Sequence, residues 1–567
     1  MSSFRKSLLA AILKHLLRGK SLIQSVFAFW ISPLSSPQKA PSSTQSSTQS
    51  STATPGAVDG TGQTTTIPPA VRSSRTARGD FLREAEALLL GPLAGDGLLR
   101  LSRALKAQFR ERLQSDPACM LPSYNHRLPR GHETGRYLAV DVGGSTLRVA
   151  LVELRGQGED VRGRESEIVS MKSYPIGMDV KSLRGVAFFD WMAARIVETL
   201  EKESRPNGSV ASVLPMALAW SFPIEQTSLR GGLIHDMGKG FRAADGLVGE
   251  DLGAVIEAAC RRSALPAELC VILNDGNATL LSCAYLHNST RFGLILGTGV
   301  NIAAYLPVPL IGSTKFGDRP KEWFDEARSV IVNTELGMFG KDILPVTRWD
   351  ALLKKGHSRP DFQPLEQMVG GMYLGEIARF ALLEAIRTTG VFGGIVPESL
   401  NSPYSFGTET MSLIEGDVSL TMEKSISLFS KLHPSPHIPT ALDMAFLRDI
   451  CALISRRSAA IVAASLHAVW ELRLEGIRES MASSESSAIS TAEAEKEVAL
   501  ERTMVSFNGS VIESYPGYRA MCQQFVDELV AAGGDGKPGA RIDLVPAKES
   551  SLLGAGVALA AAVSEAA

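Results

Sequence analysis

A glycine-rich turn between two apolar segments is the first feature of the sequence that could do chemistry. The stretch LAVDVGGSTLRVALVEL, residues 138–154, places Asp141, two glycines and two hydroxyl residues between runs typical of β-strands. About six residues separate the runs, too few for a helix, so we expect a β-hairpin. Its turn has two interpretations. It is an ordinary tight turn in which Asp141 satisfies backbone groups, or a phosphate cradle in which Asp141 holds Mg2+ through water.

A second turn of the same kind follows about 150 residues later in the chain. The stretch FGLILGTGVNIAAYL, residues 292–306, again shows a strand, a glycine turn with a hydroxyl residue, and a strand. Two such turns indicate two related halves that bind one polyphosphate from both sides. This arrangement differs from a P-loop, whose G-x-x-x-x-G-K-[ST] motif does not occur in the sequence.

An Asn-Asp pair stands where a strand is expected to end and a helix to begin. In VILNDGNATLLSCAYL, residues 271–286, Asn274 and Asp275 follow an apolar strand. Asn-Asp-Gly is a good turn sequence, and a simple turn is one interpretation. The other is a carboxylate held at a strand end, where it accepts the proton of a substrate hydroxyl.

Further polar residues interrupt apolar stretches. The strand expected at 216–222 ends in Ser221-Phe222-Pro223, and Lys239 follows between two glycines. Glu335 is isolated in the apolar stretch VNTELGMFG. A lone glutamate there is often a surface residue, but beside the other polar groups it is also a candidate hydrogen-bond acceptor for a polyol.

Strands that alternate with helices position these residues, which is typical of an α/β fold. The periodicity predicts the strand hairpins 137–154 and 292–306 and single strands at 216–222, 269–273 and 503–507. It predicts helices at 81–114, 186–202, 248–262, 277–286, 366–388, 443–472 and 514–532. Residues 483–500 are predicted to form a surface insertion.

Composition bounds the class of protein. The chain has 567 residues, a formal net charge of −2 and 44% hydrophobic residues, enough for two or three domains with large cores. The balanced charge gives no reason to expect a nucleic-acid partner. Six scattered cysteines without a C-x-x-C pair indicate a reducing compartment.

The first 75 residues differ from the rest of the chain. Basic residues punctuate an apolar leader, residues 1–34, and no acidic residue precedes Asp59. This pattern is typical of a mitochondrial transit segment or an interfacial membrane anchor, and less of a secretory signal. A helix that docks on the protein's own core is the alternative. Residues 35–70 form a Ser/Thr/Gln/Pro-rich linker that cannot bury enough apolar area to fold.

Eight motifs together resemble the eukaryotic hexokinases and glucokinases, in the order seen in that family and over roughly residues 80–565. They are the opening hairpin, SFPIEQ…GKGF, LNDGNATLLSCAY, GLILGTGVN, VNTELGMFG, EQMVGGMYLGEIARFALLEA, FNGSVIESYPGY and VPAKESSLLGAGVALAAAV. The resemblance implies the α/β, actin-like ATPase fold, with two lobes around an ATP and sugar cleft. It divides the folded region into an N-terminal half, 78–286, with a small-lobe core at 134–273, and a C-terminal half, 290–565. The C-terminal half forms the large lobe with 78–130, and the final helix returns to the small lobe.

The resemblance also implies roles for single residues. It implies transfer of the ATP γ-phosphoryl group to the 6-hydroxyl of glucose or a related hexose, with ATP and Mg2+ bound and Asp275 as general base. The implied phosphate and nucleotide residues are Asp141 (towards Mg2+ through water), Gly143, Gly144, Ser145, Thr146, Arg148, Thr298, Gly299, Gly371, Gly509 and Ser510. The implied sugar-binding residues are Ser221, Phe222, Lys239, Asn274, Asp275, Asn301, Glu335 and Glu366, of which Lys239 also acts in catalysis.

Several positions depart from the family pattern. The threonines usual before the lysine and after Asn-Asp are Gly238 and Gly276, and the usual Gly-Gly-Thr-Asn turn ends in Ser145-Thr146. Leu336 replaces a tryptophan, and Leu552 and Leu553 stand in a stretch that usually reads Gly-Ser-Gly-Lys/Arg-Gly. Two hypotheses therefore stay open: a working hexose kinase, and a hexokinase-like regulatory or sugar-sensing protein with impaired catalysis.

Overall fold

The computed structural model describes residues 74–200, 213–235, 237, 240–482, 488–533 and 539–563. The leader, the linker, Gly238 and Lys239 lie outside the described residues, so the predictions made for them remain predictions.

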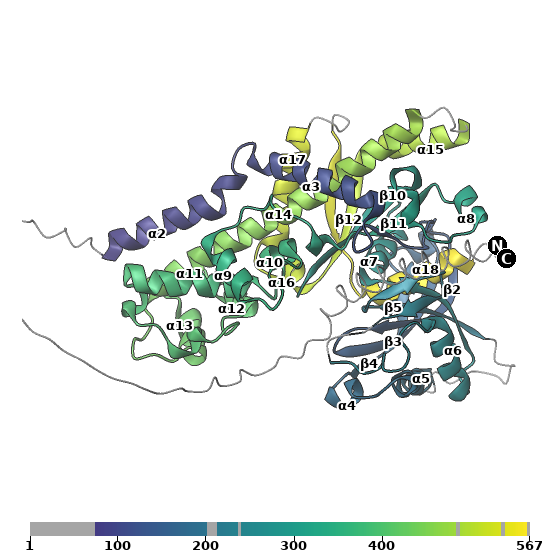
Figure 1. Cartoon of the computed structure of the whole chain (residues 1–567), viewed down its shortest axis with the longest axis horizontal. Helices are drawn as coiled ribbons and strands as arrows, with labels where there is room; N and C mark the ends of the chain where they lie inside the picture. The colour runs from purple at the N-terminus through teal and green to yellow at the C-terminus, as the bar shows by residue number, and fades with distance from the viewer. Residues whose placement is uncertain are drawn as a thin grey trace, which may run out of the picture.

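Two β-sheets organise the described chain (Figure 1). The smaller sheet has the strand order β4-β3-β2-β5-β8, and the larger one has the order β1-β11-β10-β9-β12-β13. The strands of the smaller sheet are β2 (Thr134–Val142), β3 (Thr146–Arg155), β4 (Ser166–Pro175), β5 (Leu214–Trp220) and β8 (Ala267–Leu273). Those of the larger sheet are β1 (Leu121–Pro122), β9 (Thr290–Leu296), β10 (Val300–Pro307), β11 (Ser329–Asn333), β12 (Arg502–Asn508) and β13 (Arg541–Pro546). A short ribbon, β6 (Ile224–Gln226) with β7 (Gly232–Ile234), stands apart.

The smaller sheet brings three strand ends to one edge. The predicted hairpin is present as antiparallel β2 and β3, and β2, β5 and β8 run parallel to one another. Their registers pair Val142 with Trp220 and Ala219 with Leu273. Because the carboxyl ends of parallel strands meet at one sheet edge, the residues that follow these strands lie on the same side.

The larger sheet contains the second predicted hairpin, as antiparallel β9 and β10. Its core is built around the long helix α14 (Ala441–Ala482), which packs with α3 (Gly97–Ser115), α17 (Tyr518–Gly533), α12 (Thr408–Glu415) and α11 (Leu374–Thr389) (Figure 1). Among the described helices, α14 alone is long and apolar enough to cross a membrane, but 83% of its most apolar window is buried inside the protein. It is therefore a core helix of this lobe.

Two helices join the sheets. α7 (Asp275–Ala284) follows β8 and packs on β9, while α18 (Ser550–Val563) packs on α7, β2 and β5. Gly554 permits this close approach, because an added Cβ would overlap the carbonyl oxygen of Ala278. The hydroxyls of Thr279 and Ser550 lie 2.9 Å apart across the same contact.

Glycines and a proline split two predicted helices. Residues 81–114 form α2 (Ser74–Leu89) and α3, separated by Gly91-Pro92, because proline lacks the N–H that would continue a helix. Residues 366–388 form α10 (Pro364–Val369) and α11. The predicted helix 514–532 is α17, which begins at Tyr518 after the short helix α16 (Ser510–Ser514). Further helices are α4 (Met178–Lys181), α5 (Val186–Leu200), α6 (Leu252–Arg262), α8 (Lys321–Glu326), α9 (Arg348–Gly356) and α13 (Glu423–Leu432).

The predicted insertion at 483–500 is anchored at its end. Its described part contains α15 (Ala488–Val498), and Glu497 of this helix forms a double ion pair with Arg291 of β9, at 2.6 and 2.9 Å. Arg473 of α14 donates to the same carboxylate. Both arginine side chains are almost fully buried, so Glu497 is their counter-charge and its pKa is lowered to about 2.

Candidate active site

Asp141 lies at the end of β2, where it is buried beside the first glycine turn. Arg148, its register partner on β3, donates from Nε and Nη2 to Oδ2 at 2.8 and 2.6 Å. Nη1 of the same arginine donates to Glu549 at 2.9 Å. Burial raises the pKa of Asp141 above the ordinary aspartate value, although the Arg148 guanidinium opposes this shift. The sequence analysis did not identify Glu549, which precedes α18.

The backbone of the first turn is fixed by its own hydrogen bonds. The N–H of Gly143 donates to the carbonyl of Thr146 at 3.0 Å, and Ile176 donates to the carbonyl of Ser145 at 2.8 Å. Gly143 and Gly144 are half-buried and Ser145 is exposed. The turn is thus rigid and reachable from solvent, as a phosphate cradle requires.

Ser221 continues the same sheet edge. Its N–H donates to the carbonyl of Val142 at 3.2 Å, which ties the end of β5 to the end of β2. The ring of the next residue, Phe222, is buried against Trp220 and Phe241, with centroids 5.1 and 4.9 Å away. Because its ring belongs to the core, Phe222 has its backbone rather than its ring to offer a sugar.

Asn274 and Asp275 start α7 as the sequence predicts. The Asn274 Oδ1 atom caps the helix by accepting from the N–H of Asn277 at 2.8 Å. Asp275 is half-buried, and its Oδ1 atom accepts from the N–H of Gly276 at 2.8 Å. The carbonyl of Gly276 packs so closely on Gly293 of β9 that a Cβ there would lie 2.5 Å from it. Asp275 therefore follows a strand of the smaller sheet, and the helix that it begins packs directly on the larger sheet.

A chain of amides and a carboxylate stands at the end of β11. Asn301 Nδ2 donates to Asn333 Oδ1 at 2.7 Å, and Asn333 Nδ2 donates to Glu335 Oε1 at 2.8 Å. Glu335 adopts a left-handed backbone, with φ of 52°, that is unfavourable for a residue other than glycine. Such strain is typical of functional positions held by their surroundings. The sequence analysis did not identify Asn333.

Asp275 and Glu335 are neighbours in the fold, although they are 60 positions apart in the sequence. A Cβ added to Gly276, the residue after Asp275, would lie 3.4 Å from the Cβ of Ala303, and Ala303 is the register partner of Asn333. Burial raises the pKa of Glu335, the hydrogen bond from Asn333 opposes that shift, and the charge of Asp275 adds to it. Because a buried carboxyl group with a raised pKa is typical of a functional site, Glu335 and its neighbours form the candidate chemical centre.

Glu366 of α10 lies beside the second glycine turn. Its Oε2 atom accepts from the N–H of Val300 at 3.0 Å. A Cβ on Gly299 would collide with this carboxylate, so only glycine permits the contact. Glu366 thereby connects the sugar-side network to the turn that contains Thr298.

The second turn is enclosed by the other predicted nucleotide residues. Gly371 donates to the carbonyl of Gly297 at 2.8 Å, and Met372 donates to that of Thr298 at 3.0 Å. Gly509 has φ of +127°, and a Cβ there would overlap the carbonyl group of Leu296. Ser510 begins α16 next to Gly297. The helix breaks between α10 and α11 at Gly370-Gly371, because here the backbone contacts the second turn so closely that a Cβ on Gly371 would lie 2.7 Å from the carbonyl oxygen of Gly297.

The structure assembles the predicted residues in three groups. The first surrounds Asp141 and Ser221, the second joins Asp275 to Asn301 and Glu335, and the third surrounds Thr298. Lys239 lies outside the described residues. The sequence offered weak signals for both missed residues. Asn333 is a polar residue at the end of an apolar strand, and Glu549 is a carboxylate within VPAKESSLLGAGVALAAAV, the last of the eight motifs.

Four of the positions that depart from the family pattern, Gly276, Leu336, Leu552 and Leu553, are packed into the fold. Leu336 and Leu552 are fully buried, and Leu553 is half-buried in α18. A Cβ on Gly276 would lie 3.4 Å from that of Ala303, so the site has room for little more than one methyl group. The leucines serve the core at these positions.

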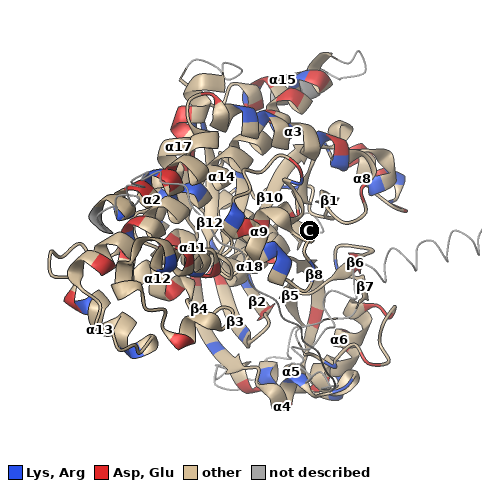
Figure 2. Cartoon of the chain, turned by 60° about the vertical axis from the view of Figure 1, so that its left-hand side comes forward, with Lys and Arg blue, Asp and Glu red and all other residues tan. Residues whose placement is uncertain are grey.

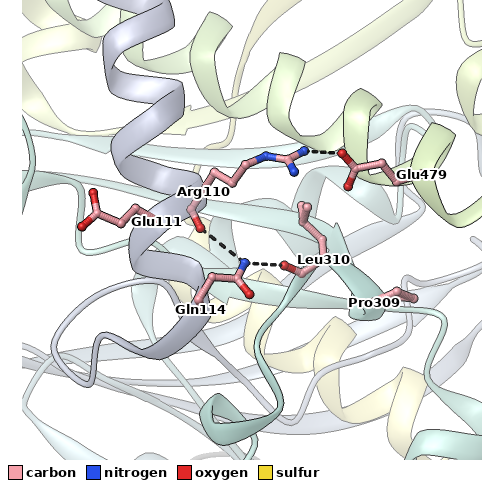
Figure 3. Close-up of a pocket in the computed structure, with 6 residues that line it drawn as sticks. All are labelled: Arg110, Glu111, Gln114, Pro309, Leu310 and Glu479. Atoms are coloured by element: carbon pink, nitrogen blue, oxygen red, sulfur yellow. Dashed lines mark hydrogen bonds and ion pairs between the residues drawn. The ribbon is translucent and has the colours of Figure 1, made fainter.

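A shallow depression of about 440 Å³ lies elsewhere, between α3 and the end of α14 (Figure 3). Arg110 crosses it to Glu479 at 2.7 Å, and Gln114 donates to the carbonyl of Leu310 at 3.2 Å. These contacts hold its walls together, and it contains none of the predicted site residues.

Comparison with known proteins defines the class of this chain. Two family models, both described as hexokinase, match residues 93–285 and 291–562. Hexokinase-1 of Nicotiana tabacum is 30% identical over 469 residues, 81% of this chain and 87% of that protein. A hexokinase of Schwanniomyces occidentalis is 27% identical over 500 residues, 86% of this chain and 95% of that protein. The chain therefore belongs to the hexokinase family.

The solved structures agree on the fold. A hexokinase from Schistosoma mansoni complexed with glucose superposes with a TM-score of 0.65 at 23% identity and covers 85% of this chain and 99% of its own. The predicted actin-like ATPase fold, an α/β fold, is confirmed. The chain is thus a hexokinase-type sugar phosphotransferase that uses ATP.

Proposed function

We propose that this phosphotransferase moves the γ-phosphoryl group of ATP to the 6-hydroxyl of glucose or a related hexose, with Asp275 as the general base. The observation that carries the proposal is the position of Asp275 at the first turn of α7, beside Glu335 and the Asn301–Asn333 network. A carboxylate there accepts the hydroxyl proton as the oxygen attacks phosphorus.

The sugar-side groups match the needs of a polyol. Each sugar hydroxyl both donates and accepts hydrogen bonds, so a site for it needs carboxylates and amides at fixed positions. Asn274, Asn301, Glu335 and Glu366 supply such groups, each held by at least one hydrogen bond of its own. Ser221 and Lys239 are the proposed contacts from the smaller lobe.

We propose that Asp141 holds Mg2+ through water at the first turn. Mg2+ in kinases is typically bound by one or two carboxylates together with substrate phosphates, and the Asp141 carboxylate beside a glycine turn that solvent reaches fits this pattern. The bound metal would neutralise phosphate charge during transfer. Arg148 already lies on the Asp141 carboxylate and would orient it for the metal.

A second candidate function is a sugar-sensing or regulatory protein with impaired catalysis. It is favoured by the buried Leu552 and half-buried Leu553 in the stretch where the family pattern reads Gly-Ser-Gly-Lys/Arg-Gly. The intact Asp275–Glu335 pair favours the enzyme.

Substitution of the proposed base tests its role. We expect Asp275→Asn to lower kcat at least about 100-fold, because general-base catalysis contributes factors of 10²–10⁴, while glucose still raises the melting temperature. Asp251→Asn is the matched control, since Asp251 also stands at a helix start of the same lobe and caps α6 at 2.9 Å. A kcat within about ten-fold of wild type in Asp275→Asn would overturn the assignment.

We further propose that the leader, residues 1–34, attaches this otherwise cytosolic protein to the mitochondrial or another membrane surface. Its basic and apolar composition supports this, because such segments bind at the lipid interface. Fusion of residues 1–40 to a fluorescent reporter tests the proposal. A membrane-bound signal is expected, and a diffuse cytosolic signal would contradict it.

A further inference from the structure

One end of the larger lobe carries the most exposed aliphatic side chains of the described protein. Val418 is 83% exposed, Leu420 97%, Ile438 77% and Leu442 73%. Among the other large hydrophobic residues that the structure describes, only Met178 exceeds 70%. Three of the four stand in the two loops that flank α13 (Glu423–Leu432) and Leu442 stands in the first turn of α14, so one partner segment that lies along this short helix can contact them all. We call this surface, formed by these four side chains, the aliphatic tip.

Both loops of the aliphatic tip are held rigidly. Asp417 accepts four hydrogen bonds, from the N–H and hydroxyl of Ser419 and from those of Ser425, and its pKa is lowered to about 2. This fixes the loop that contains Val418 and Leu420. The aliphatic side chains are therefore presented to solvent by an ordered loop, which reduces the entropy lost when a partner binds.

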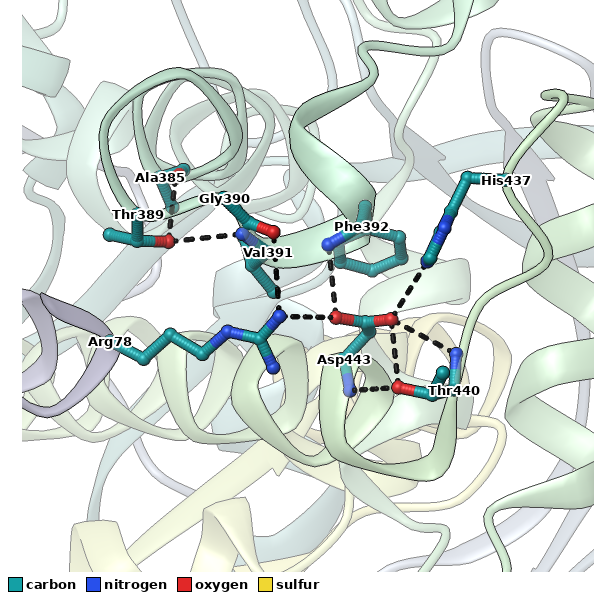
Figure 4. A network of polar contacts seen from close by, with 9 residues as sticks. All are labelled: Arg78, Ala385, Thr389, Gly390, Val391, Phe392, His437, Thr440 and Asp443. Carbon is teal, nitrogen blue, oxygen red and sulfur yellow. Dashed lines mark hydrogen bonds and ion pairs between the residues drawn. The ribbon is translucent and has the colours of Figure 1, made fainter. Parts of the chain in front are cut away.

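The second loop is fixed by Asp443, which also anchors the first described helix (Figure 4). Its carboxylate accepts from the N–H and hydroxyl of Thr440 at 3.0 and 2.8 Å and pairs with His437 at 3.1 Å. On its other oxygen it pairs with Arg78 of α2 at 3.2 Å. Asp443 is 2% exposed, so this junction is built into the fold.

This junction places the attachment point of the leader beside the aliphatic tip. Arg78 lies four positions after Ser74, where α2 begins, and Ile438 and Leu442 flank the residues that Asp443 holds. The start of α2 and helix α13 lie at the same end of the molecule (Figure 1). Residues 35–73 connect this end to the leader, and a flexible chain of that length has a typical reach of about 35 Å.

Apolar side chains match between the leader and the aliphatic tip, and charge does not oppose their contact. The leader contains five basic and no acidic residues, with apolar residues between them. Side chains of both charges lie around α12 and α13 (Figure 2). Within residues 395–449 the exposed acidic residues are Glu398, Glu409, Glu423 and Asp449, and the basic residues are Lys424, Lys431 and Arg448. This near balance does not repel a basic segment, so the apolar side chains provide the attraction.

We propose that the leader of the same chain, residues 1–34, docks on the aliphatic tip when the protein is free in solution. The linker makes this contact intramolecular, at an effective concentration in the millimolar range. Docking hides the apolar face of the leader, so that a membrane must compete for it. The aliphatic tip thus binds, within the same chain, the leader that we proposed above as the membrane anchor.

Trp30, the one tryptophan of the leader, reports on docking in the full-length protein. Its emission is the difference between the spectra of wild type and Trp30→Phe. In the tip variant, Val418, Leu420, Ile438 and Leu442 are each changed to serine. The control variant changes three exposed residues elsewhere, Met178, Val248 and Val346, to serine. Since all seven side chains are exposed, kinase activity and melting temperature should stay at the wild-type value in both variants.

We expect blue-shifted Trp30 emission in wild type that persists on 100-fold dilution, moves to the water-exposed position in the tip variant and stays in the control. Water-exposed emission in wild type, or a blue shift that survives in the tip variant, would overturn the proposal. A blue shift lost on dilution would assign the tip to the leader of a second copy and also overturn it.

Binding to vesicles of phosphatidylcholine and phosphatidylglycerol at 3:1 tests whether the aliphatic tip binds the leader or enters the membrane itself. We expect the tip variant to bind them at least about five-fold tighter than wild type, because docking no longer competes. Weaker binding of the tip variant would mean that the aliphatic tip itself enters the lipid, against the proposal. If neither protein binds, the membrane anchor proposed above fails, and the Trp30 emission still decides the docking.

Discussion

Asn333 is predicted to be a positioning residue for the sugar site, and substitution by alanine tests this. The change removes the Nδ2 donor to Glu335 at 2.8 Å and the Oδ1 acceptor of Asn301 at 2.7 Å. A hydrogen bond to a charged group is worth about 1.5–3 kcal/mol. Since 1.36 kcal/mol is a factor of ten, loss of the Glu335 contact alone lowers kcat/KM for the hexose by roughly 10- to 150-fold.

A steady-state assay coupled to ADP formation measures this effect, with hexose varied at saturating ATP. We expect the KM for ATP to stay within about two-fold, because Asn333 contacts no nucleotide-side residue. Asn125→Ala is the matched control, since Asn125 is a buried asparagine beside the same strand, with its carbonyl 3.0 Å from the N–H of Ile331. Its side-chain nitrogen has no partner to lose.

The same variant has a predictable pH dependence. Burial and the charge of Asp275 already raise the pKa of Glu335, and Asn333 opposes this shift, so its removal raises that pKa further. The ionised form of Glu335 is the stronger acceptor for sugar hydroxyls, because both carboxylate oxygens then accept and the bonds are charge-assisted. Activity is therefore full above this pKa and lost as the pH falls through it. The acid limb of kcat/KM should lie at higher pH in Asn333→Ala than in wild type.

Two results would refute this reasoning. One is a kcat/KM for Asn333→Ala equal to that of Asn125→Ala, which would mean that Glu335 needs no positioning donor. The other is an acid limb that stays in place or moves to lower pH, which would mean that Glu335 is not the titrating acceptor.

Two more substitutions test the nucleotide side and the core. Gly371→Ala should raise the KM for ATP about ten-fold or more and spare glucose binding, because its Cβ would lie 2.7 Å from a backbone oxygen of the second turn. Gly407→Ala, with open space around it, is the control in the same kinetic assay. Asp350→Asn should lower the free energy of unfolding by about 3–5 kcal/mol, because the fully buried Arg457 pairs with Asp350 at 2.6 Å and would lose its counter-charge. In denaturant titrations, Asp361→Asn should leave that free energy at the wild-type value, since its carboxylate is 76% exposed; equal losses in both variants would contradict the assignment.

The hairpins and the residues at strand ends could be predicted from local pattern. Apolar alternation on either side of a glycine turn fixes β2–β3 and β9–β10 without any long-range information. The Asn274 cap was likewise visible, because an asparagine before an apolar helical run is a start signal.

The split of the predicted helix 366–388 required knowledge of the tertiary structure. Gly370-Gly371 sits in a continuous helical pattern, and the break arises because this backbone meets the turn at Gly297. Asn333 was missed for a similar reason, since an asparagine after an apolar strand looks like a turn former until Asn301 and Glu335 are seen on either side of it.

Buried ion pairs escape sequence reasoning altogether. Asp350 and Arg457 are 107 positions apart, and Arg148 meets Glu549 across 401 positions. Nothing in the local pattern of any of these residues indicates its partner. The long-range part of the site is therefore a property of packing, in which helix α18 brings Glu549 to the first turn.

ADP release by the full-length protein with MgATP, measured with and without glucose, tests the central claim most directly. The account predicts glucose-dependent turnover on the order of one per second or more, abolished by Asp275→Asn and unchanged by Asp251→Asn. Turnover no greater than that of Asp275→Asn, in a protein whose melting temperature still rises with glucose, would contradict it, because such a site binds the sugar without transferring phosphate.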